Sequence, residues 1–254
     1  MKTLCDLSGK NFIVTGASSG IGRETAITIS KLGGSVLLTG RNKERLSETM
    51  EQMENPGKHI IEEIDLGKVD AIGIWLKDVI TRHSLQFDGM VYAAGIYRLR
   101  PLAVTEYSEL QEVMNINFLA PVCMLKNLLQ GAICRKGSSF VFISSVSAEI
   151  GEIGLLGYGA SKAALNSAVR SAAQEMARKG HRVNAIAPAS IDTDMLKKYM
   201  DSLDECQKSE FKTKFPLGIG KPEDVANMAA FLLSDNAGWI TGSVINIDGG
   251  YSKS

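Results

Sequence analysis

The sequence has no surplus of charge of either sign. Its 28 lysines and arginines balance its 28 aspartates and glutamates, and charged residues make up 22% of the 254-residue chain. Nucleic acids and anionic membrane surfaces attract proteins that carry clustered positive charge. Neither is therefore expected as a partner, and we expect a small-molecule substrate.

Long apolar runs are missing as well. No stretch approaches the ~18 apolar residues of a transmembrane helix, and residues 1–6 contain no apolar segment of signal-peptide length. The sequence therefore predicts a cytoplasmic protein that neither spans a membrane nor is secreted.

Metal-binding clusters are not evident. The four cysteines (Cys5, Cys123, Cys134 and Cys206) are widely separated, and so are the three histidines (His59, His83 and His181). Structural zinc sites usually need closely spaced cysteine pairs. We expect free thiols and no metal site.

The sequence does contain a glycine-rich turn between an apolar run and a helical pattern. Residues 11–15 (NFIVT) form a short run with an apolar centre, Gly16, Gly20 and Gly22 follow, and residues 23–32 have helical periodicity. Such glycines permit a tight turn and the close approach of a pyrophosphate, whose charge the helix N-terminus stabilises. This context predicts a dinucleotide site, although the spacing is Gly-x3-Gly-x-Gly rather than Gly-x-Gly-x2-Gly.

The second expected strand, residues 35–39, ends at Gly40 and Arg41. An acidic residue at this point would hydrogen-bond the adenosine ribose of NAD, whereas an arginine can pair with the 2′-phosphate of NADP. The sequence therefore favours NADP. The alternative is that Arg41 is an ordinary surface cation before the next helix.

Further strands are expected at residues 59–64, 90–94, 139–143, 182–186 and 243–247, separated by helix-length segments that include one long helix at 106–129. Such βαβ crossovers imply a parallel sheet covered on both faces, with ligands at the carboxyl edge of the strands. No linker or repeat divides the chain. We expect one α/β domain over residues 1–254, a Rossmann-type doubly wound parallel sheet of seven strands with helices on both faces.

Tyr158 and Lys162 stand four residues apart in an alanine-rich helical pattern, so both should lie on one helical face. Lowering the pKa of a phenol by about three units takes roughly 4 kcal/mol, which an ammonium ~4 Å away supplies only at an effective dielectric of about 20. The pair would therefore act in a partly dry cleft. Ser145 follows an expected strand and could polarise a substrate oxygen.

The least regular segment, residues 191–220, is expected to form either a lid or a peripheral pair of short helices. Trp75 and Trp239 are expected to be packing residues.

Taken together, these motifs resemble the short-chain dehydrogenase/reductase family along nearly the whole chain. The resemblance is carried by residues 15–22 (TGASSGIG), Asp65-Leu66, Ala94-Gly95, Asn117, Ser145, Tyr158, Lys162, residues 184–188 (NAIAP), Thr193 and residues 248–250 (DGG). It implies a nicotinamide cofactor and the interconversion of a carbonyl group and an alcohol.

The resemblance also implies roles. Tyr158 would donate a proton to a carbonyl oxygen held by Ser145 while NADPH delivers hydride to the carbon. Lys162 would lower the pKa of the phenol and hold the nicotinamide ribose, and Asn117 would anchor a water that supplies protons. The cofactor would contact Gly16, Ser18, Ser19, Gly20, Ile21, Gly22, Arg41, Asp65, Leu66, Ala94, Gly95, Tyr158, Lys162, Pro188, Ile191 and Thr193.

Two departures from the family pattern affect the expected geometry. Tyr92-Ala93 stands where the family commonly has Asn-Asn, and Ala189 replaces a usual glycine after Pro188. The first removes an asparagine that would help to tie the central strands to the cofactor turn, and the second could alter the nicotinamide pocket.

Within the family the sequence is most similar to 3-oxoacyl-[acyl-carrier-protein] reductases. By that resemblance Lys136 and Lys179 would dock an acidic carrier protein, and the chain would form a homotetramer through its fourth and fifth helices. A cation near the end of a surface helix is equally explained by the helix dipole. Glu149 and Glu152, in the expected substrate loop, suit a polar, hydroxylated substrate unless they face solvent.

The leading hypothesis is therefore an NADPH-dependent reductase of a ketone, with a 3-oxoacyl thioester or a polar keto-sugar as candidate substrates. A non-catalytic NADP-sensing protein is the alternative of another class, but a sensor would not need the Ser-Tyr-Lys-Asn set. A sugar-nucleotide epimerase would usually need a separate substrate domain, for which the chain has no room.

Overall fold

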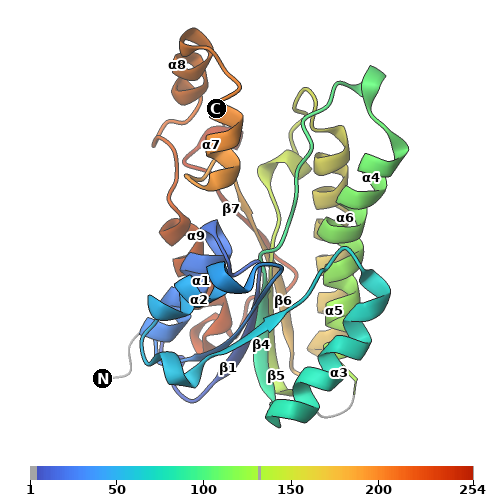
Figure 1. Ribbon diagram of the computed structural model, residues 1–254, viewed down its shortest axis with the longest axis vertical. Helices are drawn as coiled ribbons and strands as arrows, with labels where there is room; N and C mark the ends of the chain where they lie inside the picture. The colour runs from blue at the N-terminus through green and yellow to red at the C-terminus, as the bar shows by residue number, and fades with distance from the viewer. Residues whose placement is uncertain (1–4, 131–132, 254) are drawn as a thin grey trace.

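Seven parallel strands form the centre of the structure, a computed structural model that describes residues 5–130 and 133–253 (Figure 1). The strands are β1 (Asn11–Thr15), β2 (Ser35–Gly40), β3 (Ile60–Glu63), β4 (Phe87–Tyr92), β5 (Cys134–Ile143), β6 (Arg182–Pro188) and β7 (Val244–Ile247). They lie in the order β3-β2-β1-β4-β5-β6-β7, and every neighbouring pair is parallel. The predicted doubly wound sheet is confirmed.

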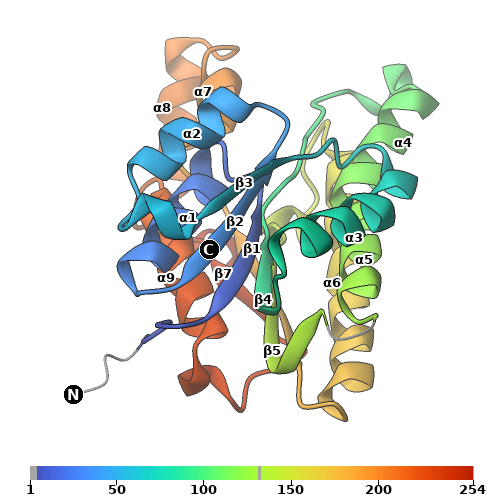
Figure 2. The same cartoon turned by 60° about the horizontal axis from the view of Figure 1, so that its bottom comes forward.

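Helices cover both faces of this sheet (Figures 1 and 2). They are α1 (Gly20–Lys31), α2 (Lys43–Glu51), α3 (Ile72–His83), α4 (Tyr107–Met114), α5 (Ala120–Leu128), α6 (Leu156–Ala177), α7 (Asp194–Met200), α8 (Glu205–Thr213) and α9 (Pro222–Leu233). α1, α2 and α9 contribute to the core on one face, and α3, α5 and α6 to the core on the other.

The two cores follow from the period-2 alternation of the strands. In β1, Phe12 and Val14 point into the core beneath α1 and α9, while Ile13 points into the core beneath α3, α5 and α6. Central strands that are buried on both faces therefore appear in the sequence as continuous apolar runs. This is why these strands could be predicted from the sequence.

The expected long helix at residues 106–129 is interrupted. α4 and α5 are separated by a single π-helical turn, η4 (Asn115–Leu119), in which the Ala120 N–H bonds the Asn115 carbonyl. Pro121 lacks the N–H that would otherwise bond the carbonyl of Asn117, so the regular α-helical ladder cannot continue here.

The tryptophans behave differently from each other. Trp75 packs against the second core, as expected. Trp239, expected to pack, is 100% exposed, because it lies in the turn between η6 (Asp235–Ala237) and β7, where no described element covers it. That expectation was wrong for the isolated chain.

Other findings bear on the remaining expectations. Cys5, Cys123, Cys134 and Cys206 are free thiols. Within residues 5–130 and 133–253, no three metal-binding side chains gather into a metal site, and no helix has the length and apolarity needed to cross a bilayer. The expected absence of a signal peptide depends in part on residues 1–4, which lie outside the described residues.

Candidate active site

The glycine turn lies where the strand order reverses. β1 sits between β2 and β4, and the chain winds outward in opposite directions from this point, which makes it the ligand-binding crevice of a doubly wound sheet. A Cβ at Gly16 (φ +67°) would lie 2.9 Å from the Ala94 backbone, so only glycine fits. The Thr15 hydroxyl accepts hydrogen bonds from the N–H groups of Ala93 and Ala94, both at 3.1 Å.

The turn fits a pyrophosphate. A Cβ at Gly22 would lie 2.3 Å from the Gly16 carbonyl oxygen, and one at Gly20 (φ +52°) would lie 3.0 Å from the Thr193 side chain. These glycines bring bare backbone to the N-terminus of the 12-residue helix α1, where Ser19 makes no side-chain capping bond. Exposed backbone N–H groups at a helix N-terminus are suited to phosphate oxygens.

The expected adenosine contacts lie near this turn. A Cβ at Gly40 would be 3.5 Å from the Ser18 hydroxyl, so the end of β2 adjoins the glycine turn. Arg41 is exposed and forms no ion pair with any described residue. Asp65 is exposed after β3, its carboxylate accepting the Gly67 N–H at 3.0 Å, whereas Leu66 is buried.

Tyr158 and Lys162 lie on one face of α6, as the spacing predicts. Lys162 Nζ is 5.7 Å from the centre of the Tyr158 ring and donates to the Ile143 carbonyl at 2.7 Å. Ser145 stands just beyond the end of β5, and Lys162 and Ser145 are both buried. Two adjacent elements, β5 and α6, therefore bring the three side chains to the carboxyl edge of the sheet.

Burial controls the ionisation of this pair. It raises the pKa of Tyr158 to about 12; the hydrogen bond with Ser145 opposes this, and the negative charge of Glu152 adds to it. Burial also lowers the pKa of Lys162 to about 8. The expected lowering of the phenol pKa by Lys162 is not found in the chain itself, because desolvation of the buried phenol is the largest contribution to its pKa.

Asn117 lies behind the reactive side chains. It is fully buried in η4, where its side-chain oxygen accepts the Ile96 N–H at 3.0 Å and its amide donates to the Ile96 carbonyl at 2.8 Å and to Ser161 at 3.0 Å. A Cβ at Gly95 would lie 3.4 Å from Asn117 Oδ1 and 3.6 Å from Lys162 Nζ. Asn117, Gly95 and Lys162 are therefore neighbours.

A cavity of about 550 Å³ opens beside these residues, a volume in the usual range for small-molecule sites. The expected site residues that line it are Ile21, Gly95, Ser145, Tyr158, Lys162, Pro188, Ile191 and Thr193. The expected residues outside its lining are Gly16, Ser18, Ser19, Gly20, Gly22, Arg41, Asp65, Leu66, Ala94 and Asn117.

The irregular segment 191–220 forms two short helices, and these helices also line the cavity. α7 contributes Met195, Leu196 and Tyr199, and α8 contributes Phe211. In Figure 1 both helices stand at the top left, across from α4. The two expectations for this segment, a lid and a pair of helices, are therefore not exclusive.

Ion pairing and aromatic contacts hold these helices in place. Arg45 of α2 pairs with Asp194 of α7 at 2.7 Å. A series of ring contacts follows: Tyr199 with Phe211 (5.3 Å), Phe211 with Phe215 (5.1 Å) and Phe215 with Tyr251 (4.7 Å).

Sequence reasoning did not identify several lining residues, namely Tyr97, Ser147, Leu155, Tyr199, Phe211, Lys214 and Tyr251. They come from four separate segments of the chain, and the aromatic content of residues 191–220 was the only available signal. Tyr97 meets Tyr158 edge to face, with ring centres 6.3 Å apart.

The two departures from the family pattern have defined surroundings. Tyr92 is buried, and its hydroxyl donates to the Ile116 carbonyl in η4 at 2.8 Å. The π-helical turn leaves this carbonyl without a backbone hydrogen-bond donor. The Thr15 hydroxyl, which accepts the Ala93 and Ala94 N–H groups, makes the link between the central strands that was expected of an asparagine. Ala189 lines the cavity.

Lys136 and Lys179 lie far from the cavity within one chain. Lys136 is exposed near the start of β5, seven residues or ~23 Å before its end. Its side chain approaches Gly180, next to Lys179. Both lysines therefore occupy the edge of the sheet opposite the catalytic side chains.

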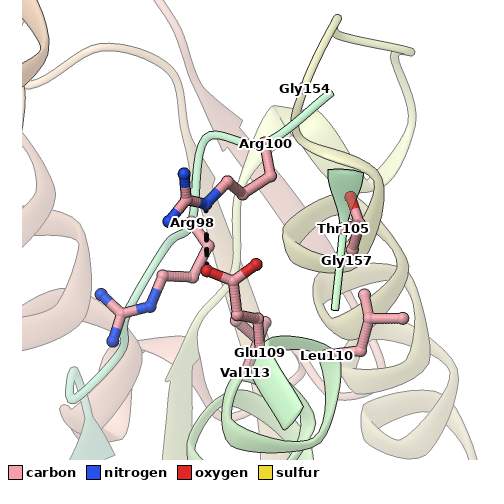
Figure 3. A pocket seen from close by; sticks show the side chains of 8 residues that line it. All are labelled: Arg98, Arg100, Thr105, Glu109, Leu110, Val113, Gly154 and Gly157. Atoms are coloured by element: carbon pink, nitrogen blue, oxygen red, sulfur yellow. Dashed lines mark hydrogen bonds and ion pairs between the residues drawn. The ribbon is translucent and has the colours of Figure 1, made fainter. Parts of the chain in front are cut away.

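A second, much smaller cavity of about 10 Å³ lies between α4, α6 and residues 98–105 (Figure 3). It has room for about one water molecule. Arg100 pairs with Glu109 at 3.0 Å beside it, and Arg98 pairs with Glu112 at 2.7 Å. We assign it no ligand.

A parallel sheet with a glycine turn at its switch point and a Ser-Tyr-Lys cluster at its carboxyl edge defines a Rossmann-type oxidoreductase. The chain belongs to the short-chain dehydrogenase/reductase family: a family model described as "Enoyl-(Acyl carrier protein) reductase" matches residues 16–252.

Relatives and solved structures agree with this assignment. The chain is 34% identical to a 3-oxoacyl-[acyl-carrier-protein] reductase, FabG, of Rickettsia prowazekii over 97% of this chain and 98% of the relative. A short-chain type dehydrogenase/reductase from Mycobacterium ulcerans superposes with a TM-score of 0.86 at 31% identity, covering 97% of this chain and 90% of the other. An aldohexose dehydrogenase from Thermoplasma acidophilum gives a TM-score of 0.85 at 29% identity, covering 98% and 96%.

Proposed function

We propose that the protein is a cytoplasmic, NADP(H)-dependent carbonyl reductase that interconverts a ketone and a secondary alcohol. The observation that carries this proposal is the convergence of Ser145, Tyr158 and Lys162 on one wall of a cavity that adjoins the glycine turn. When bound, the nicotinamide supplies the hydride. The chain then has to hold the carbonyl group and give it a proton.

Each of the residues has a distinct part in this proposal. With a pKa of about 12, Tyr158 keeps its proton at neutral pH and can donate it to the carbonyl oxygen. The Ser145 hydroxyl, which donates to Ser147 in the chain alone, would rotate to donate its one proton to the same oxygen. Lys162 carries the positive charge beside the phenol, and Asn117 holds the segment at Ile96 that borders this site. Such general-acid catalysis contributes ~100-fold or more.

NADP(H) is the proposed coenzyme because of the end of β2. Gly40 carries no carboxylate to bind the adenosine ribose, and the Arg41 guanidinium is exposed without an ion-pair partner among the described residues. A 2′-phosphate would supply the anion that this guanidinium lacks.

The relatives suggest two substrate classes. The FabG relative is a 3-oxoacyl-[acyl-carrier-protein] reductase and the Thermoplasma neighbour an aldohexose dehydrogenase. A carrier protein that delivers an acyl thioester would dock on Lys136 and Lys179. Within one chain these lysines lie at the edge of the sheet opposite the cavity. A polar keto compound would instead bind against the polar side chains of the cavity, such as Ser147 and Glu152.

The Tyr158→Phe variant tests the proposed reaction. NADPH oxidation with any accepted ketone should fall at least ~100-fold, because the proton donor is removed. Tyr107→Phe, a change at an exposed tyrosine of α4, should retain full activity. Activity of Tyr158→Phe within tenfold of the wild type would exclude the proton-donor role.

The same assay separates the enzyme from a sensor. Tight NADPH binding, with no change in absorbance at 340 nm across a panel of ketones and alcohols, would favour a non-catalytic NADP-sensing protein. Turnover of any member of the panel would exclude it.

A further inference from the structure

One wall of the cavity carries a carboxylate next to the catalytic serine. Glu152 lies in the loop between β5 and α6 and lines the cavity together with Ser145 and Tyr158. The Ser147 hydroxyl donates to its carboxylate, and the Ser145 hydroxyl donates to that of Ser147 at 3.1 Å. A single hydroxyl therefore connects Glu152 to the catalytic serine.

Backbone hydrogen bonds hold the loop that carries Glu152 in place. The Glu152 carbonyl accepts the Leu155 N–H at 3.2 Å, and the Gly154 carbonyl accepts the Arg100 N–H at 2.9 Å; Figure 3 shows Arg100 beside Gly154. Burial and the neighbouring Glu152 carboxylate raise the pKa of Tyr251, which lines the same cavity. The carboxylate is thus positioned at the cavity wall rather than free in solvent.

The carboxylate also lies close enough to the phenol to act on it, because its charge contributes to the raised pKa of Tyr158. A substrate whose carbonyl oxygen meets Tyr158 and Ser145 would bring the atoms next to that carbonyl toward Glu152. An ionised carboxylate only accepts hydrogen bonds, so the substrate must offer a donor at this place.

The charged side chains of the cavity lining favour a substrate whose hydrogen-bond donor is neutral. At the position next to the carbonyl, Glu152 repels an anionic group such as the carboxylate of a 2-keto acid. An ammonium group there would be attracted by Glu152 but repelled by Lys162 and Lys214, which line the same cavity, whereas a neutral donor meets neither repulsion. The remaining common donor is a hydroxyl group, and Ser147 and Tyr251 beside Glu152 can bind further hydroxyls.

Building on the proposed reductase function, we infer that the substrate is a neutral hydroxy ketone of the sugar or polyol type. Its hydroxyl on the carbon adjacent to the carbonyl donates a hydrogen bond to Glu152. Glu152 is therefore the residue that selects a hydroxylated substrate over a plain alkyl ketone or an acyl thioester.

The test compares kcat/KM for 2-hydroxycyclohexanone with that for cyclohexanone, both with NADPH. The wild type should prefer the hydroxylated compound. Glu152→Leu should lower the ratio of the two values by about tenfold to a hundredfold, since hydrogen bonds to charged groups are worth this much. Glu152→Gln, whose amide oxygen still accepts, should lower it less, and this milder variant serves if the leucine variant fails to fold.

Glu149→Gln is the matched control, because Glu149 is an exposed glutamate of the same loop; its ratio should equal that of the wild type. An unchanged ratio in Glu152→Leu and Glu152→Gln would overturn the inference. So would a wild-type preference for cyclohexanone, an aminoketone or a 3-oxoacyl thioester, while leaving the reductase function intact. Failure of the wild type to reduce any ketone would instead refute the proposed function on which the inference rests.

Discussion

At the scale of the residue, desolvation sets the chemistry of the catalytic pair. Burial makes the Tyr158 phenol a weaker acid than it is in water and the Lys162 ammonium a stronger one. The phenol is therefore fully protonated at neutral pH, while the lysine begins to lose its charge only slightly above it.

The pH profile of reduction should reflect Lys162. With a pKa of about 8, Lys162 is protonated below that pH and neutral above it, so kcat/KM for ketone reduction should fall as the pH rises through about 8. Steady-state rates between pH 6 and 10 measure this. Lys162→Arg keeps its charge across that range, so its profile should lack the decline. A wild-type profile that stays flat to pH 9.5 would contradict the assignment.

Coenzyme choice should depend on Arg41. Arg41→Asp removes the proposed partner of the 2′-phosphate and introduces a carboxylate able to bind the ribose hydroxyls, so the ratio of kcat/KM for NADPH to that for NADH should fall by at least tenfold. Lys43→Asp is a matched charge reversal two residues away and should leave the ratio unchanged. Equal wild-type rates with both coenzymes would refute this use of Arg41.

Much of the site could be predicted from residues that lie close together in sequence. The Tyr158–Lys162 spacing and the glycine turn each belong to one local element, and the structure places them as the pattern predicts. The pKa of the phenol could not be predicted, because it depends on burial. The partners of Glu152 could not be predicted in full, because Tyr251 reaches it from nearly 100 residues away.

At the scale of the element, the π-helical turn η4 joins the central strands to the catalytic site. Its geometry releases the Ile116 carbonyl, which accepts the Tyr92 hydroxyl, and directs the Asn117 side chain onto Ile96. The Tyr92 hydroxyl thus gives the Ile116 carbonyl of η4 the hydrogen-bond donor that the helix itself does not supply.

Tyr92→Phe should therefore destabilise the fold. It leaves the Ile116 carbonyl buried without its donor, at a cost of about 1–3 kcal/mol in the free energy of unfolding. Urea denaturation monitored by circular dichroism measures this. Tyr107→Phe, at an exposed position, should change the free energy of unfolding by less than about 0.5 kcal/mol. Equal stability of the two variants would show that the Tyr92 hydrogen bond contributes nothing.

Apolar periodicity could predict all seven strands but not this turn. A π-helical turn keeps helical periodicity over most of residues 106–129, and only the missing N–H of Pro121 indicates the break. The start of β5 was also missed: it begins at Cys134 rather than at residue 139, because Gly137 (φ +86°) and an irregular register with β4 obscure the alternation.

At the scale of the whole molecule, apolar side chains remain exposed on α4, η4 and α5. Tyr107 is 77% exposed, Leu119 42% and Val122 40%. Exposed apolar surface of this kind often marks a protein interface. The homotetramer predicted from family resemblance would form through the fourth and fifth helices expected from the sequence; residues 106–129 correspond to α4, η4 and α5, and the fifth expected helix is α6.

Sedimentation velocity tests this assembly. The wild type should sediment as a tetramer, and Val122→Glu should shift it to smaller species by placing a charge in the interface. Ile74→Glu, at an exposed apolar position on α3, should sediment like the wild type. A wild type that is monomeric at micromolar concentration would refute the prediction.

The ion pair between Arg45 and Asp194 has a consequence for the speed of turnover. It connects α2, which follows Arg41, to the start of α7, which follows Thr193 of the cavity lining, and both side chains are about half exposed. Dissolved electrolyte weakens such an exposed pair. Where release of the oxidised coenzyme limits turnover, kcat should therefore be higher at moderate ionic strength than in dilute buffer. The turnover rate would then depend on a contact that is remote from the reacting atoms.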